Sequence, residues 1–109
     1  SSPAPRALAT ALLVADELKY GRKHVVQVEA LYDASRRAFL SVVNKLPDTA
    51  RMAVLAGHNP AISELVGYLS HHDLFDGMPT GSAVAIRFEG LAWAEVGQSA
   101  GEFQWFEQP

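Results

Sequence analysis

The chain has 109 residues, of which 49% are hydrophobic and 19% charged, so it suits one domain with a single hydrophobic core. Its net charge of −3 argues against nucleic acid or an acidic membrane as a partner, and no apolar run approaches the roughly 20 residues of a membrane-spanning helix. The absence of cysteine excludes disulfides, thiolate metal sites and a cysteine nucleophile, and with the lack of a signal-peptide pattern it fits a cytoplasmic protein.

The first half of the chain alternates helical and β-strand patterns. Apolar residues recur at helical spacing after Pro5, again before the stop signal of Pro47, and a third time after residues 57–60. Between the helices, residues 25–28 predict a short strand, and the continuous apolar run 52–56 predicts a strand covered on both faces. The predicted core-facing stripes of the three helices are Leu8, Ala11, Leu12, Ala15 and Leu18; Phe39, Val42, Val43 and Leu46; and Ile62, Leu65, Val66 and Leu69.

The second half of the chain shows antiparallel patterns. Residues 82–89 alternate as a strand, Gly90 turns the chain, residues 92–96 return, and residues 102–106 alternate again. Helices that alternate with strands, followed by a hairpin at the edge, predict a mixed α/β sheet. We expect one domain over residues 1–109.

Residues 57–60, Gly-His-Asn-Pro, lie where the 52–56 strand is predicted to end and the third helix to begin. His58 is therefore expected at the carboxyl end of a strand and beside a helix N-terminus, with Asn59 as the N-cap and Pro60 in the first turn. Open α/β sheets bind ligands at such places, and free N–H groups with the helix dipole favour an anion, usually phosphate. The alternative is that His58 only caps or packs a turn.

Arg6 lies in the first turn of the first predicted helix, and residues 1–3 look like a loop that leaves a strand. Consecutive β-loop-α units of a parallel sheet open their loops at the same edge, so Arg6 and His58 are predicted to converge on one ligand. A guanidinium binds phosphate oxygens in bidentate fashion. The alternative is a solvated arginine, although its charge opposes the dipole at a helix start.

Two other groups of side chains have weaker functional interpretations. Adjacent histidines point in different directions and the separated pairs of known metal motifs are absent, so the histidine-rich loop indicates a solvated loop and no metal site. The residues of that loop are His71, His72 and Asp73, with Asp76 nearby. Four aromatic residues indicate packing rather than a binding surface: Trp93, Phe103, Trp105 and Phe106.

Several segments carry a resemblance to a known family. Residues 2–11, SPAPRALATA, resemble the S-x-x-x-R-A-x-x-T-A segment of the histidine phosphatase (phosphoglycerate mutase-like) superfamily, and residues 57–60 resemble its second-histidine motif. Residues 30–35, ALYDAS, lie between them as in small bacterial phosphohistidine phosphatases. The hairpin entry at residues 79–83 and the ending around Trp105 are similar too. The ordered set is more specific than either motif alone.

The resemblance implies a three-layer α/β/α sandwich with a mostly parallel mixed sheet, a C-terminal antiparallel hairpin and no cofactor. In the family a phosphoryl group passes to a histidine in an Arg-His-Gly motif on the first strand, but this sequence has no Arg-His pair. Arg6 matches the second phosphate-binding arginine, and His58 matches the second histidine, which stabilises charge in the transition state. Asn59 would contribute through its backbone N–H. We therefore expect a chain truncated at its N-terminus, lacking the central strand and inactive alone.

The implied function is a phosphatase that works through a phosphohistidine intermediate. Its phosphate-bearing substrate is either phosphohistidine in a signalling protein or a small phosphoester. The general acid stays open: Glu29 and Asp33 lie in the plausible region, but Asp33 also suits a helix start, and a phosphoramidate nitrogen is easy to expel without an acid. The alternatives are a non-catalytic phospho-ligand or protein-binding domain that has lost the nucleophilic histidine, and a purely structural α/β domain.

Overall fold

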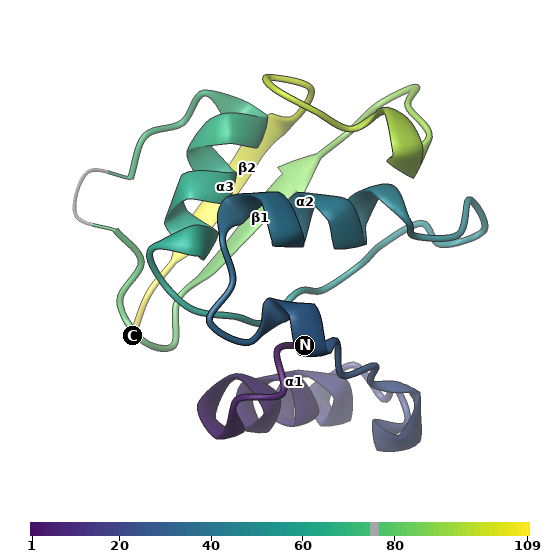
Figure 1. Cartoon of the computed structure of the whole chain (residues 1–109), viewed down its shortest axis with the longest axis vertical. Coiled ribbons are helices and arrows are strands. Elements are labelled where there is room, and N and C mark those ends of the chain that lie inside the picture. Colours follow the sequence, from purple (N-terminus) through teal and green to yellow (C-terminus); the bar gives the residue numbers. More distant parts are fainter. Residues whose placement is uncertain (75–76) are drawn as a thin grey trace.

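Three α-helices and one pair of strands form the regular structure of the computed structural model, which describes residues 1–74 and 77–109 (Figure 1). The predicted existence of the three helices is confirmed. The helices are α1 (Pro5–Glu17), α2 (Arg36–Asn44) and α3 (Ala61–Ser70), and the strands are β1 (Ala83–Arg87) and β2 (Glu102–Glu107). Three short 3₁₀ helices lie between them: η1 (Arg22–His24), η2 (Glu29–Leu31) and η3 (Trp93–Glu95).

The main hydrophobic core lies between α2, α3 and the segments that flank them. In Figure 1 the two strands run behind α3, while α2 crosses in front. Phe39 of α2 and Leu31 of η2 are each only 1% exposed, and burying a side chain of this size stabilises the fold by about 1.5–3 kcal/mol. The stripes predicted for the second and third helices face the core at Phe39, Val42, Val43, Ile62, Leu65 and Leu69. Leu46 lies beyond the end of α2, and Val66 is buried outside this core cluster. The buried members of the cluster are Leu31, Phe39, Val43, Ala61, Leu65, Leu69 and Val96.

Helix α1 lies apart from this core and is drawn below α2 in Figure 1. Within the part of the chain that the structure describes, no residue of α1 belongs to the buried core cluster. The helix approaches the rest of the molecule through small side chains, because its buried residues are Ala7 and Ala15. The predicted stripe is confirmed at Ala15 and wrong at Leu18, which is the C-cap residue after the last helical turn and is 52% exposed.

The C-terminal sheet is a two-stranded antiparallel pair. Val84 of β1 lies opposite Phe106 of β2, and the register shifts once, between Ala85 and Ile86. Because β2 begins at Glu102, the antiparallel hairpin expected at this end of the chain is present, but its second strand comes later than a return at residues 92–96 would place it.

The strand predicted at residues 92–96 is wrong, since this segment contains η3. The Trp93 indole N–H donates a hydrogen bond to the Ala50 carbonyl at 2.7 Å. The side-chain amide of Asn44, at the end of α2, donates to the carbonyls of Trp93 and Val96, both at 2.9 Å. These bonds hold the segment against α2 instead of against β1.

The strands predicted at residues 25–28 and 52–56 are also wrong in the form expected, because neither segment is assigned as a β-strand. The first two residues of the chain lie between them and join them. A strand needs a continuous ladder of backbone hydrogen bonds to a neighbour, but residues 1–2 make only two such bonds to residues 25–28 and one to residues 52–56. Three bonds make this connection: Ser1 N to Val26 O at 2.8 Å, Val28 N to Ser1 O at 2.9 Å, and Ser2 N to Ala56 O at 3.0 Å.

The predicted three-layer sandwich with a mostly parallel sheet is therefore not confirmed. Across residues 1–74 and 77–109 the β1–β2 pair is the only sheet, and the fold is a compact α/β arrangement. Leu55 packs against the main core, but Met52 and Val54 are 70% and 55% exposed. The 52–56 run is thus covered on one face, and its other face is open.

Candidate functional site

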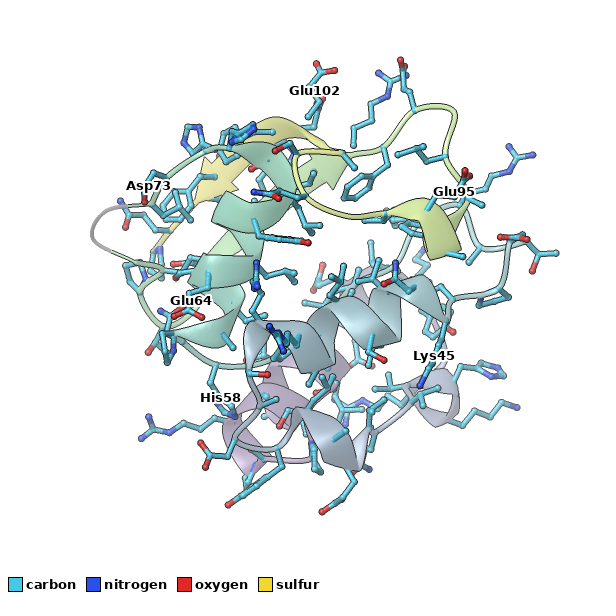
Figure 2. The ribbon with its side chains drawn as sticks, turned by 45° about the horizontal axis from the view of Figure 1, so that its top comes forward. Lys45, His58, Glu64, Asp73, Glu95 and Glu102 are labelled. Carbon is cyan, nitrogen blue, oxygen red and sulfur yellow. The ribbon has the colours of Figure 1, made fainter. Side chains whose placement is uncertain are left out.

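A cavity of about 300 Å³ collects residues from three separate segments of the chain. It is lined by Ala4 at the N-cap of α1, by Tyr32 and Asp33 after η2, and by His58 before α3. Figure 2 shows His58 beside the faint purple ribbon of α1. The fold therefore brings an imidazole to the start of the first helix.

The turn that carries His58 depends on a close contact between Gly57 and Phe39. A Cβ atom at residue 57 would lie 2.2 Å from Cζ of the Phe39 ring, so only glycine leaves room for that ring. The His58 carbonyl accepts a hydrogen bond from the N–H of Ile62 at 3.1 Å, which ties the turn to the first turn of α3. The half-buried His58 is thus fixed from the core on one side and from α3 on the other.

The N-terminus of α1 is fixed by Ser2, which is fully buried. Its N–H donates to the Ala56 carbonyl at 3.0 Å, and its Oγ accepts from the N–H of Ala4 at 3.2 Å. No side chain caps the helix at Ala4, and Pro5 occupies the first helical position. The partial positive charge of a helix start without an acidic cap favours an anion at this end of the cavity.

Tyr32 and Asp33 form the third wall of the cavity. Leu31, 1% exposed, anchors the preceding η2 in the core, and the Tyr32 N–H donates to the Glu29 carbonyl at 3.0 Å. Asp33 adopts a left-handed backbone with φ of +50°, which Asp and Asn tolerate better than most residues. Sequence reasoning singled out Asp33 but overlooked Tyr32; the only available signal was its place in the ALYDAS segment.

Arg6 lies two positions after Ala4, in the first turn of α1. Its side chain is exposed and is not among the groups that line the cavity. The helix nevertheless begins at the cavity that contains His58, so the backbone of Arg6 stays close to this site. Convergence of the guanidinium and the imidazole on one ligand stays a prediction.

Asn59 does not cap α3 as expected, because the N-cap residue is Pro60 and no side chain bonds to the helix start. Instead the Ser63 hydroxyl donates to the Asn59 Oδ1 atom at 2.5 Å, and the Asn59 amide donates to the Met78 carbonyl. The Ser63 Oγ in turn accepts from the Met78 N–H at 3.1 Å. The Asn59 side chain therefore joins α3 to the loop before β1, while the predicted role of its backbone N–H is untested.

The two adjacent histidines after α3 contact the C-terminal hairpin. The His72 ring stacks on Phe103 with a centroid separation of 3.7 Å, and the His71 Nε2 atom contacts the Ser99 hydroxyl. Among the residues that the structure describes, no group of three or more His, Asp or Glu side chains is arranged to hold a metal ion. Asp76, the remaining member of the predicted loop cluster, lies outside the described residues.

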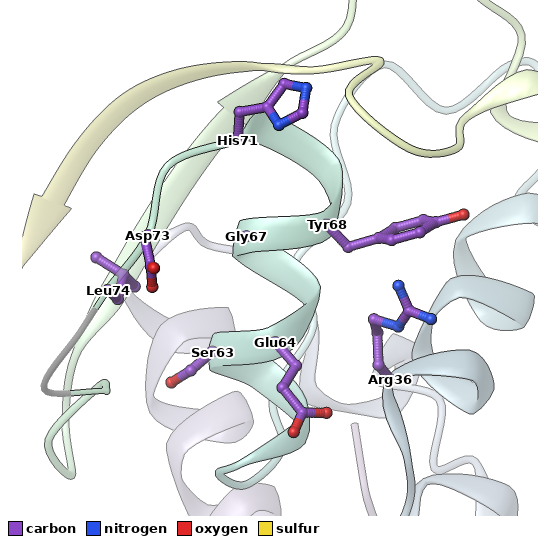
Figure 3. Close-up of a pocket in the computed structure, with 8 residues that line it drawn as sticks. All are labelled: Arg36, Ser63, Glu64, Gly67, Tyr68, His71, Asp73 and Leu74. Carbon is purple, nitrogen blue, oxygen red and sulfur yellow. The ribbon is translucent and has the colours of Figure 1, made fainter.

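A second hollow of about 620 Å³ follows the surface of α3 (Figure 3). Figure 3 shows Tyr68 and Arg36 pointing toward one another on one side of the helix. The Arg36 guanidinium carbon lies 3.9 Å from the centroid of the Tyr68 ring, a cation–π contact. The residues that line this hollow are Arg36, Ser63, Glu64, Gly67, Tyr68, His71, Asp73 and Leu74.

None of the helices that the structure describes is long and apolar enough to cross a membrane. No protein-family model and no curated protein sequence matches the chain. A solved structure described as "Putative Phosphohistidine Phosphatase SixA" from Nakamurella multipartitia matches 99% of this chain and 84% of its own, at 18% identity and a TM-score of 0.67. The chain therefore has a fold similar to that of this protein.

Proposed function

We propose that this protein is a phosphatase that hydrolyses phosphohistidine or a small phosphoester through a phosphohistidine intermediate. The observation that supports it most is the shared cavity of His58 and the start of α1. An imidazole donor and a helix N-terminus are two groups that bind phosphoryl oxygens, and here they come from distant parts of the chain. The solved structure with a similar fold is described as a phosphohistidine phosphatase, and this description agrees with the proposed chemistry.

In this proposal His58 donates a hydrogen bond to a phosphoryl oxygen and stabilises the charge that develops on it. Arg6, in the first turn of α1, extends over the cavity and binds the same group through its guanidinium. The backbone N–H of Asn59 adds a further donor. The proposal includes neither a metal nor a cofactor, and it places the protein in the cytoplasm, with either a phosphohistidine-bearing signalling protein or a small phosphoester as the substrate.

The nucleophilic histidine comes from a segment that precedes Ser1. Two features support the place of such a segment. Ser1 bonds to Val26 and Val28 in the pattern of a parallel strand pair, while Ser2 bonds to Ala56 on the opposite side. A strand that continued upstream from Ser1 would add backbone hydrogen bonds to residues 25–28 on one side and to residues 52–56 on the other. It would end at the cavity, where its last side chains would face His58.

The test uses the protein together with its upstream segment. Phosphate release is measured from a synthetic phosphohistidine peptide and from p-nitrophenyl phosphate, and labelled protein is isolated after a short reaction. We expect turnover and a bound phosphoryl group that is labile in acid and stable in base. His58→Ala should lower kcat by about 10²- to 10³-fold, as does loss of a single oxyanion donor elsewhere. His24→Ala on exposed η1 is the matched control. Absence of both turnover and labelled protein contradicts the proposal.

A second proposed function uses the same cavity without a nucleophilic histidine. It is a non-catalytic domain that binds a phosphate-bearing ligand. Calorimetry with phosphate or vanadate separates the two functions: binding that His58→Ala removes, without turnover by the longer protein, favours the binding domain. A folded sample that binds neither anion, before and after His58→Ala, indicates a purely structural domain.

A further inference from the structure

The function proposed above gives no role to two side chains that line the cavity, Tyr32 and Asp33. We infer, on the basis of the function proposed above, that these two residues bind the leaving group of the substrate and select an imidazole ring. Asp33 accepts a hydrogen bond from the ring nitrogen that carries no phosphoryl group, and the Tyr32 ring covers a face of the imidazole.

The first argument is the charge of Asp33. A carboxylate repels phosphoryl oxygens, so Asp33 does not belong to the part of the cavity that binds the anion. It stabilises a substrate that presents an N–H donor next to its phosphoryl group. A phosphohistidine ring protonated on its second nitrogen has such a donor, whereas a simple phosphate ester has none.

The second argument is how firmly the two residues are held. Leu31 is anchored in the core directly before them, and Ser35, two residues after Asp33, is the N-cap residue of α2, where its carbonyl accepts a hydrogen bond from the Ala38 N–H at 3.1 Å. The left-handed backbone at Asp33 turns the chain between these two anchors. The side chain of Tyr32, 59% exposed, and that of Asp33 therefore stand at the solvent side of the cavity, where a leaving group departs.

The transfer of the phosphoryl group from the substrate ring balances in bonds, electrons and protons. The P–N bond of the substrate breaks, its electron pair stays on the ring nitrogen, and the phosphoryl group forms a bond with the nucleophilic histidine of the proposed function. A ring that keeps its proton on the second nitrogen, held by Asp33, leaves as neutral imidazole. Without that proton it would leave as the far less stable imidazolide anion.

The test compares kcat/KM for a phosphohistidine peptide and for p-nitrophenyl phosphate, over a range of pH, in the protein with its upstream segment. Asp33→Asn preserves size and suits the left-handed backbone. We expect it to lower kcat/KM for the peptide by about 10- to 100-fold, as for a lost hydrogen bond to a charged group, and to change the ester by less than about threefold. The decline of the peptide rate with rising pH should begin at lower pH in this variant.

Further variants keep the result interpretable. Asp33→Gly also fits the left-handed backbone and removes the carboxylate, so it should lower kcat/KM for the peptide as Asp33→Asn does. Asp48→Asn, in the exposed turn after α2, is the control and should leave kcat/KM for the peptide unchanged. Tyr32→Phe should retain kcat/KM for the peptide, and Tyr32→Leu should lower it several-fold. Equal losses on both substrates, or none, overturn the inference while leaving the proposed function intact. A parent protein that hydrolyses neither substrate counts against the proposed function itself.

Discussion

The Phe39 ring lies so close beneath the backbone of Gly57 that a Cβ atom at Gly57 would approach its Cζ atom to 2.2 Å. This contact links the most deeply buried aromatic side chain of the core to the residue that precedes His58. The position of the imidazole therefore depends on how the core is packed, and not only on the loop that carries it.

We expect Gly57→Ala to lower the free energy of unfolding by about 1–3 kcal/mol, because the methyl group forces the Phe39 ring or the turn to move. The measurement is urea denaturation followed by circular dichroism. Phe39→Leu in the same chain makes room for the methyl group, so the double variant should lose less than the sum of the single losses. Additive losses would show that the two residues do not compete for space.

Ser2→Ala should loosen the start of α1. The substitution removes the acceptor for the Ala4 N–H in a fully buried position, which costs about 1–3 kcal/mol when no water replaces it. Amide exchange in the first turn of α1 should accelerate more than exchange in α3. Ser41→Ala, at an exposed position of α2, provides the comparison. Unchanged exchange in α1 would mean that the Ser2 hydroxyl does not hold the helix.

If the upstream strand of the proposed function pairs with residues 52–56, it should protect backbone N–H groups of that segment. Hydrogen exchange is compared between residues 1–109 alone and the same chain with its upstream segment. We expect slower exchange at residues 53–56, because a parallel neighbour would accept hydrogen bonds from alternate N–H groups there. Exchange at residues 93–95 in η3 should stay the same. Equal exchange at residues 53–56 in both proteins would place the upstream segment elsewhere.

Asp16 and Arg22 give a pH-dependent link between α1 and η1. The Arg22 guanidinium donates to both carboxylate oxygens, with Nε to Oδ1 at 2.9 Å, and these hydrogen bonds hold the pKa of Asp16 below its ordinary value. Because the pKa of Asp16 is lowered in the folded state, the ion pair stabilises the fold fully above the unfolded carboxyl's pKa of about 3.9. This stabilisation is lost as the pH falls through the pKa of the folded state.

Asp16→Asn should therefore slightly reduce the thermal midpoint at pH 7, and the difference from the parent should vanish near pH 2. The effect is small because both side chains are exposed to solvent. Thermal denaturation at the two pH values checks this. A difference that persists at acid pH would mean that Asp16 acts through something other than its charge.

The sequence predicted the helices well because their signal is local. The stripe of Leu65, Val66 and Leu69 repeats at helical spacing, and α3 buries it as expected. The strands were harder, because a strand exists only with a hydrogen-bonded neighbour. Val26 and Val54 have strong β-propensity, yet their segments gain only short ladders through residues 1–2. Propensity cannot supply a partner.

The strand predicted at residues 92–96 was wrong for a different reason. The alternation of residues 92–96 suits a strand, but two residues far away in the sequence bind this segment and hold it beside α2. The Asn44 amide donates to two of its carbonyls, and the Ala50 carbonyl accepts from its indole N–H. Such long-range polar contacts leave no periodic pattern to detect. The Gly-His-Asn-Pro motif before α3 singled out His58, which lines the cavity, and its role there stays a prediction. No comparable signal marked Tyr32, because its position in the cavity depends on how η2 is anchored in the core.

Because α1 lies apart from the main core and is held through small side chains, we expect it to detach more easily than the rest of the molecule. The cavity needs both parts, since Ala4 comes from the helix that is held by small side chains and His58 from a turn that is fixed by the core. Detachment of α1 would dismantle the proposed anion site while α2, α3 and the hairpin stay folded. Warming should thus abolish ligand capture several degrees before the cooperative melting of the rest, and a bound anion should delay that detachment.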